Sequence, residues 1–210
     1  MYSLWLRGGT YIRTEVHIVT SPVRQRDDVS PDHAVAAISP PISSSEPDWS
    51  REELTGRWDP GRQLLRTIRR YQYYRTRRGP IGLAGRKWNV LKHRFWSAVA
   101  GAEIPLNVSI DGGLLLPHPN GIVVHPDARI GPNCIIFQQV TLGTGGKAGT
   151  PVIGGHVDIA AGAKVLGGVT IGDHARVGAN AVVVSDVPPG TTVVGIPARI
   201  LNPRELSVLE

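Results

Sequence analysis

His118 and Glu103 are a histidine and a carboxylate whose types could together perform acid–base chemistry. A histidine ring changes protonation near neutral pH and can take a proton from a hydroxyl group. A carboxylate beside the ring would fix its tautomer and orient it. The two residues are 15 positions apart, so they meet only in a fold that brings such positions together. Otherwise they are a solvated turn residue and a surface charge.

A six-residue period in the second half of the chain indicates what that fold is. Aliphatic residues recur every six positions, with a two-residue insertion after Ile122 and a longer interruption after Leu142. Period six is neither helical nor a simple alternation, and it is typical of short strands joined by corners and stacked as a parallel β-helix. The stacked residues are expected to be Ile104, Ile110, Leu116, Ile122, Ile130, Ile136, Leu142, Ile153, Ile159, Val165, Ile171, Val177 and Val183.

Composition narrows the class of protein. The chain has 210 residues and a net charge of +6, with no apolar run long enough for a transmembrane helix. The N-terminal residues lack the pattern of a secretory signal, so we expect a cytoplasmic protein with no membrane partner. The single cysteine, Cys134, excludes an internal disulfide and a multi-cysteine metal site. It occupies an inward position of the repeat and is expected to be a small core residue, not a nucleophile.

Four segments differ in composition. They are a poorly ordered arm rich in Pro and Ser (1–48), a basic α-helical segment (49–100), the β-helix (101–201) and a C-terminal tail (202–210). The helical segment contains 13 basic and 3 acidic residues from position 51 to 100. Its arginines could bind nucleic acid or a membrane surface, but no nucleic-acid motif accompanies them, so a solvated helix face is favoured. A non-catalytic module that docks an acidic partner through this segment is a further alternative.

Two helices are predicted within the basic segment. Asp59–Pro60 is typical of a helix start, with Asp59 as the N-cap and Pro60 in the first turn. Gly79–Pro80 is expected to end this helix. A second, shorter helix is predicted over residues 87–98.

Four stretches of the repeat region resemble hexapeptide-repeat acyltransferases, and specifically the serine O-acetyltransferases. They read LLLPHPNGIVV, IFQQVTLGTGGKAG, IAAGAKVLGGVTIG and VGANAVVVSDVPPGTTVVGIPARI. The resemblance implies a mainly β fold, a left-handed parallel β-helix of three-sided coils behind an N-terminal helical segment. It also implies a homotrimer that binds acetyl-CoA between neighbouring subunits and acetylates the hydroxyl of L-serine for cysteine biosynthesis, without a metal.

The resemblance also implies roles for particular residues. His118 matches the general base of the family, and Glu103 stands where the family has an aspartate that orients this base. In a coil of about 18 residues, Glu103 would return close beneath His118. The glycine-rich interruption would border acetyl-CoA. The residues expected to contact acetyl-CoA are Gly143, Lys147, Ala161, Lys164 and Ala179.

The acceptor site departs from the family pattern. Pro117 replaces an aspartate before the base, and Thr150–Pro151 stands where the family has the His-Pro of an Arg-His-Pro that grips the serine carboxylate. Asp59 and His125 are the remaining candidates for contacts with the acceptor. The missing clamp leaves a second acceptor class open, namely a sugar, a polysaccharide precursor or another small hydroxyl compound.

His156 and His174 suggest a different class of protein. They lie 18 residues apart at the same position of the repeat, as stacked zinc ligands would in a γ-type carbonic anhydrase, which is also a hexapeptide trimer. Two stacked, exposed corner residues are the favoured interpretation, and no metal is expected.

Overall fold

The computed structural model describes residues 42–56 and 58–201. The predicted arm lies mostly outside this part of the chain, and the predicted tail lies outside it completely. The described chain begins with a short 3₁₀ helix, η1 (Trp49–Glu52), and two α-helices, α1 (Pro60–Thr76) and α2 (Pro80–Ala100). Among the described residues, neither helix is long and apolar enough to cross a membrane.

Both α-helices have a proline in the first turn, but only α1 has a side-chain cap. The Asp59 side chain caps α1 by accepting a hydrogen bond from the Arg62 amide, and Pro60 is in the first turn, as predicted. The predicted extent of the second helix, 87–98, is wrong, because α2 already begins at Pro80. The predicted end of the first helix at Gly79–Pro80 is also wrong, because α1 ends at Thr76 with Arg77 as its C-cap. Gly79–Pro80 starts α2 instead: Gly79 is the N-cap, and a proline needs no hydrogen-bond partner in the first turn.

Short parallel strands make up the rest of the described chain. Each strand has two or three residues. They are β1 (Ser109–Ile110), β2 (Val123–Val124), β3 (Arg129–Ile130), β4 (Ile135–Ile136), β5 (Thr141–Gly143), β6 (Val152–Ile153), β7 (Asp158–Ile159), β8 (Lys164–Leu166), β9 (Thr170–Ile171), β10 (Arg176–Val177), β11 (Val182–Val183), β12 (Thr192–Val194) and β13 (Arg199–Ile200).

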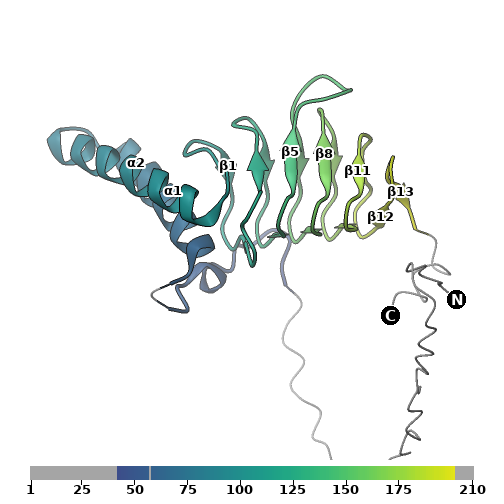
Figure 1. The fold of residues 1–210 in the computed structure, drawn as a ribbon, viewed down its shortest axis with the longest axis horizontal. Helices are drawn as coiled ribbons and strands as arrows, with labels where there is room; N and C mark the ends of the chain where they lie inside the picture. The colour runs from purple at the N-terminus through teal and green to yellow at the C-terminus, as the bar shows by residue number, and fades with distance from the viewer. Residues whose placement is uncertain (1–41, 57, 202–210) are drawn as a thin grey trace, which may run out of the picture. The chain divides into compact units, whose positions relative to one another are not determined.

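The strands form three ladders, which are the three sides of a prism (Figure 1). Side 1 contains β1, β3, β6 and β9; side 2 contains β4, β7, β10 and β12; side 3 contains β2, β5, β8 and β11. Pairing within each side is parallel, and only β13 adds to side 2 antiparallel. Because successive strands belong to different sides, the chain climbs in three-sided coils. The predicted parallel β-helix is therefore confirmed.

Stacked aliphatic side chains fill the prism. All thirteen residues predicted from the six-residue period are at most 6% exposed. Those in the strands pair in register from coil to coil, as Ile110 does with Ile130, and Ile153 with Ile171. Burying one such side chain contributes about 1.5–3 kcal/mol. The narrow interior explains why this half of the chain has a single aromatic residue, Phe137.

The two-residue insertion lies in a different place from the predicted one. Glu103 pairs with Val123, and Leu115 with Ile135, which are 20 positions apart. The next coil on side 3 needs only 18, since Val123 pairs with Thr141. The extra residues therefore lie between 116 and 122, and Val124, not Ile122, is the residue that stacks under Leu142. Ile122 is buried at the corner before β2.

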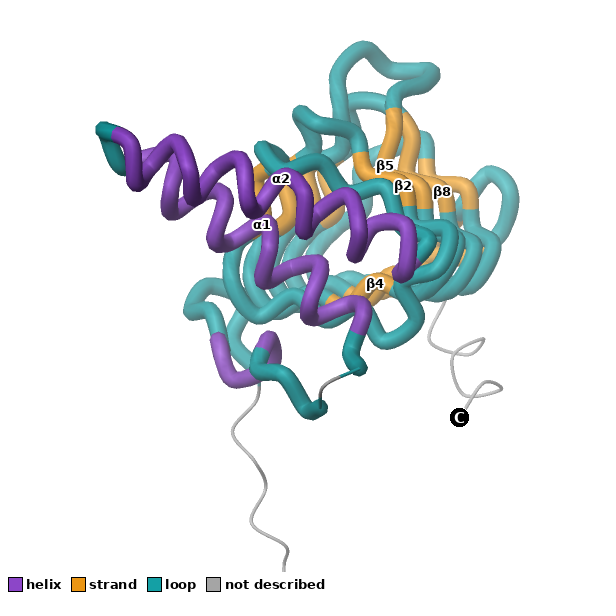
Figure 2. The backbone as a smooth tube through the Cα atoms, turned by 60° about the vertical axis from the view of Figure 1, so that its left-hand side comes forward, coloured by secondary structure: helices purple, strands orange, loops and turns teal. Residues whose placement is uncertain are grey.

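The α1–α2 hairpin packs on the first coil (Figure 2). Gly61 lies so close to Leu116 that a Cβ atom on it would be 2.6 Å from the Leu116 carbonyl oxygen. Farther along, Gln72 Nε2 donates to the Val108 carbonyl at 3.1 Å. From α2, the Ser97 hydroxyl donates to the Ala102 carbonyl. These contacts fix the helical segment against the end of the β-helix where the coils begin.

Residues 43–49, the strap, lie along the corner between sides 1 and 2. They are held by Asn133, whose side chain is fully buried. Asn133 Oδ1 accepts the Asp48 amide at 2.8 Å, and Nδ2 donates to the Ser43 and Glu46 carbonyls at 2.8 and 2.7 Å. The end of the predicted arm, 43–48, is therefore bound to the β-helix.

Candidate functional site

His118 lies on the corner between sides 2 and 3 of the first coil. The two inserted residues widen this corner, which we call the His118 corner (117–121). Pro117 and His118 are exposed. The corner starts from Leu116, whose backbone contacts Gly61 near the start of α1. The inserted residues thus carry the histidine outward from the stacked corners above it.

Glu103 lies one coil below the point at which the chain leaves the His118 corner. Its amide donates to the Ile122 carbonyl at 2.7 Å, and its carbonyl accepts the Val124 amide at 2.9 Å. Its side chain is exposed. Glu103 lies beneath Val123, and not beneath residue 121, because this coil has 20 residues and not 18. Although the structure describes both side chains, no hydrogen bond joins Glu103 to His118. The expected position close beneath His118 is therefore corrected to one beneath Val123, where the chain leaves the His118 corner.

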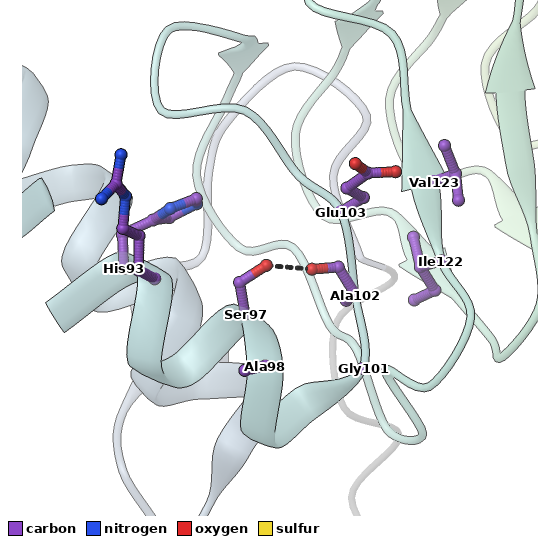
Figure 3. A pocket seen from close by; sticks show the side chains of 9 residues that line it. His93, Ser97, Ala98, Gly101, Ala102, Glu103, Ile122 and Val123 are labelled. Atoms are coloured by element: carbon purple, nitrogen blue, oxygen red, sulfur yellow. Dashed lines mark hydrogen bonds between the residues drawn. The ribbon is translucent and has the colours of Figure 1, made fainter. Parts of the chain in front are cut away.

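A cleft of about 520 Å³ opens between α2 and the first coil, and Glu103 faces it (Figure 3). Its other polar side chains are His93, Arg94 and Ser97 of α2. His93 is fixed by its Nε2, which donates to the Ile104 carbonyl at 2.8 Å. Sequence analysis did not single out these residues. The feature of the sequence that could have identified them is the four-residue spacing of His93 and Ser97, which puts both on one helix face.

Asp59 is brought toward the His118 corner by α1. It is two residues from Gly61, which contacts Leu116. Its carboxylate accepts from Arg62 Nη1 at 3.0 Å and from the Thr55 hydroxyl at 3.1 Å. Partial burial alone would raise the pKa of Asp59, but these bonds outweigh it and hold the pKa below its ordinary value. Asp59 is thus an ionised carboxylate that already has partners.

His125 lies in a regular coil. The insertion predicted to follow Ile122 would have contained it, but the inserted residues come before Ile122. His125 follows β2 on side 3, at the opposite end of this strand from the His118 corner. Its Nδ1 accepts the Asp127 amide at 3.2 Å. The backbone of β2 therefore separates the two histidines.

The residues predicted to contact acetyl-CoA border side 3. Gly143 ends β5, and Lys147 lies in the loop that follows, where its Nζ is 3.2 Å from the Asp186 carboxylate. Lys164 is on β8, and its Nζ donates to the Gln139 carbonyl. Ala161 and Ala179 are stacked at the corner between sides 2 and 3, where the Asn180 amide donates to Ala161 at 2.9 Å. Corners between sides 2 and 3 stack on one another from coil to coil. His118 lies on the lowest of them, Gln139 on the next, and Ala161 and Ala179 on the two above.

His156 and His174 are in contact at the corner between sides 1 and 2. Their Nδ1 atoms are 2.8 Å apart, so one ring donates a hydrogen bond to the other. Among the described residues, no group of three His, Cys, Asp or Glu side chains is placed to hold a metal ion. Both histidines have left-handed backbone conformations, with φ of 52° and 59°.

The His156 pair is expected to make the protein less stable in mild acid. Partial burial lowers the pKa of His156 from 6.5, and the nearby His174 lowers it further against the opposing effect of Asp158. The unfolded chain therefore binds this proton at a higher pH than the folded chain, and stability falls as the pH drops below about 6.5. Urea unfolding at pH 7.5 and 5.5 should show a smaller pH effect for His156→Asn, which tolerates the left-handed conformation. An unchanged pH effect would contradict this assignment.

Cys134 is a core residue, as predicted. It is fully buried, and burial raises the pKa of its thiol to about 12. About one thiol in ten thousand would be ionised at pH 8, and the thiolate is the reactive form. We expect Ellman's reagent to label Cys134 only after denaturation, and Cys134→Ala to keep the activity of the parent protein. Rapid labelling of the native protein would contradict the burial of this thiol.

Comparison with known proteins points to one family. No family model matches the chain. It is 42% identical over 106 residues to a serine acetyltransferase of Synechococcus elongatus, covering 49% of this chain and 43% of the relative. It is 39% identical over 116 residues to one of Mycobacterium tuberculosis, covering 54% and 51%. The chain spans about half the length of these curated relatives.

Solved structures give the same result. The soybean serine acetyltransferase apoenzyme aligns with a TM-score of 0.56 and 38% identity, over 66% of this chain and 56% of that one. A serine acetyltransferase in complex with CoA aligns with a TM-score of 0.57 and 30% identity, over 69% and 57%. The predicted fold class, a left-handed parallel β-helix of hexapeptide repeats with an N-terminal helical segment, is confirmed.

Proposed function

We infer that, because its β-helix belongs to the serine acetyltransferase family, this chain is an acetyl-CoA-dependent O-acetyltransferase whose acceptor is L-serine. The sequence identity over the β-helix carries this proposal. Solved relatives include a soybean enzyme complexed with serine and another enzyme complexed with CoA. The product, O-acetylserine, would serve cysteine biosynthesis.

His118 is the general base of the proposed reaction. Its imidazole takes the proton of the acceptor hydroxyl as the oxygen attacks the thioester carbonyl. The tetrahedral intermediate collapses, the carbon–sulfur bond breaks, and the imidazolium returns the proton to the CoA thiolate. Glu103, beneath Val123 at the end of the same corner, is the proposed positioning residue: its exposed carboxylate, once turned to the ring, would stabilise the imidazolium.

Side 3 and the corner above His118 are the proposed acetyl-CoA surface. Small side chains at Ala161 and Ala179 let an extended pantetheine arm lie against the wall of the coil. Lys164 and Lys147 supply positive charge for the phosphates. Lys147 must exchange its exposed partner, Asp186, for a phosphate, which costs little because exposed ion pairs contribute about 0–1 kcal/mol.

Asp59 is the proposed acceptor contact, since α1 carries it toward the His118 corner and its carboxylate would attract the ammonium group of serine. The second candidate acceptor is a sugar or other hydroxyl compound without a carboxylate. Thr150–Pro151 favours it, because Thr150 donates to the Asp127 carbonyl at 3.0 Å and supplies no cation to grip a carboxylate. We propose that the active protein is a cytoplasmic homotrimer with its sites between subunits.

Thiol release from acetyl-CoA tests the proposal. The full chain is assayed with L-serine and, in parallel, with L-threonine, L-homoserine and a panel of sugars. Release that depends on L-serine, with O-acetylserine as the product, is expected. Thiol release with a sugar but not with L-serine would mean that the acceptor belongs to the second class, the sugars and other hydroxyl compounds. Failure to release thiol with any acceptor would contradict the proposed acetyltransferase.

A further inference from the structure

The α1–α2 hairpin has an extreme charge. From Pro60 to Ala100 it contains eleven Lys and Arg residues and no Asp or Glu. Two arginines are used internally: Arg62 pairs with Asp59, and Arg69 pairs with Glu52 at 2.8 Å. The other nine form no ion pair within the described part of the chain. The hairpin is therefore a concentrated positive surface.

An apolar stripe runs along the outer face of α2. Its large side chains follow a spacing of seven, three and four residues, which places them on one face of a helix. They are Ile81, Trp88, Leu91 and Phe95, with exposed fractions of 75%, 57%, 60% and 56%. Gly82, Asn89 and Ala100, on the opposite face of α2, are buried. We call the four exposed residues the α2 stripe.

Basic side chains flank the α2 stripe. Lys87 and Arg94 lie on one side of it, and Lys92 lies on the other, with Nζ 5.2 Å from the centre of the Trp88 ring. Arg77 and Arg78 are at the turn between the helices, at the end of the hairpin that projects away from the β-helix (Figure 1). Exposed aromatic and aliphatic side chains bordered by Lys and Arg are typical of helices that lie in a membrane interface.

Charge distinguishes the two candidates for binding the α2 stripe, a second copy of the hairpin and an anionic lipid surface. A second copy of the hairpin would bring one surface without acidic residues against another, and the like charges flanking the stripes would repel. An anionic lipid surface attracts each basic residue and accepts the apolar side chains below its headgroups. The arginines of α1 alone favoured a solvated face, but the α2 stripe beside them favours a docked one. We propose that the α2 stripe and its flanking basic residues bind an anionic phospholipid membrane surface.

Vesicle flotation with the full chain tests this proposal. Vesicles of phosphatidylcholine alone are compared with vesicles containing phosphatidylglycerol, at low and physiological salt. We expect binding only to the anionic vesicles, at least tenfold weaker at physiological than at low salt. Trp88→Gln/Leu91→Gln/Phe95→Gln should lower the affinity at least tenfold. Arg77→Gln/Arg78→Gln/Lys87→Gln should weaken binding and reduce its salt dependence.

A matched pair of single variants tests the proposal even if the variant with Trp88, Leu91 and Phe95 replaced fails to fold. Leu91→Gln removes a stripe residue, whereas Leu83→Gln removes an exposed leucine of the same helix outside the stripe. Only the first should weaken binding. Equal binding to neutral and anionic vesicles, or equal effects of the two leucine variants, would overturn the proposal. So would a smaller assembly mass for Leu91→Gln in sedimentation velocity, which would make the stripe a contact between copies.

Discussion

Replacing His118 with asparagine is expected to lower kcat/KM for acetyl transfer by about 10²–10⁴-fold, because the acceptor hydroxyl would lose its general base. Asparagine keeps a polar side chain of similar size but cannot take up the proton. Thiol release from acetyl-CoA with the best acceptor measures the effect. His174→Asn is the matched control, since His174 is an exposed histidine on a different corner, and it should change kcat/KM less than twofold.

The expected loss has a specific form. KM for acetyl-CoA should stay nearly constant while kcat falls, because the base acts in the transition state and not in binding. Glu103→Gln should show a smaller fall in kcat, and its pH profile should shift relative to that of the parent chain. Near-parental activity of His118→Asn would remove His118 from the mechanism.

Replacing Asn133 with alanine is expected to lower the free energy of unfolding by about 3–5 kcal/mol. Three side-chain hydrogen bonds to the strap would be lost, at about 0.5–1.5 kcal/mol each. Asn133 also has φ of 61°, and a left-handed conformation costs alanine about 1–2 kcal/mol. Urea denaturation of the full chain measures the sum.

Asn133→Gly separates the two contributions. Glycine adopts the left-handed conformation freely, so this variant should lose only the hydrogen bonds and remain about 1–2 kcal/mol more stable than Asn133→Ala. If both variants unfold within about 0.5 kcal/mol of the parent protein, a range typical of surface substitutions, the strap would contribute nothing to stability. The β-helix would then be equally stable without the strap.

The core of the β-helix could be predicted because its periodicity is strict. The residue that stacks at the middle of each side is aliphatic, and twelve of the thirteen predicted positions are these stacked residues; the exception is Ile122, whose place in the stack Val124 takes. The position of the insertion could not be predicted in the same way. Ile122, Val123 and Val124 are all aliphatic, so the period alone does not tell which of them faces inward. Only the pairing of Val123 with Glu103 and Thr141 settles it.

The helix boundaries, the strap and the cleft could not be predicted from the sequence pattern. Gly79–Pro80 has the composition of a helix end and of a helix start, and the structure uses it only as a start, since α1 already ends at Thr76. The strap is held through its backbone carbonyls by Asn133, and backbone groups leave no signature in composition. The cleft beside Glu103 depends on how α2 packs on the first coil, which periodicity within either element does not specify.

The residues of the candidate site remain predictions from the sequence, and the geometry that relates them comes from the structure alone. The motif around His118 singled out the histidine, and the carboxylate followed from its spacing. Their relative position depends on the length of one coil, which the insertion changes from 18 to 20 residues. Asp59 and His118 come from segments with no shared period, so the close approach of Gly61 to Leu116, which carries the start of α1 toward the His118 corner, could not be predicted from the sequence.

The ladders divide the long axis of the prism into equal steps. Neighbouring strands are about 4.8 Å apart, so each coil above the His118 corner adds one such step. Asp158 pairs with Arg176, and removing residues 159–176 would therefore take out one step and leave the coils below it in register. The length of the prism is therefore set by the number of coils, one strand spacing for each. An elongated ligand along side 3 can be matched in length by the number of coils, without altering the end at which it reacts.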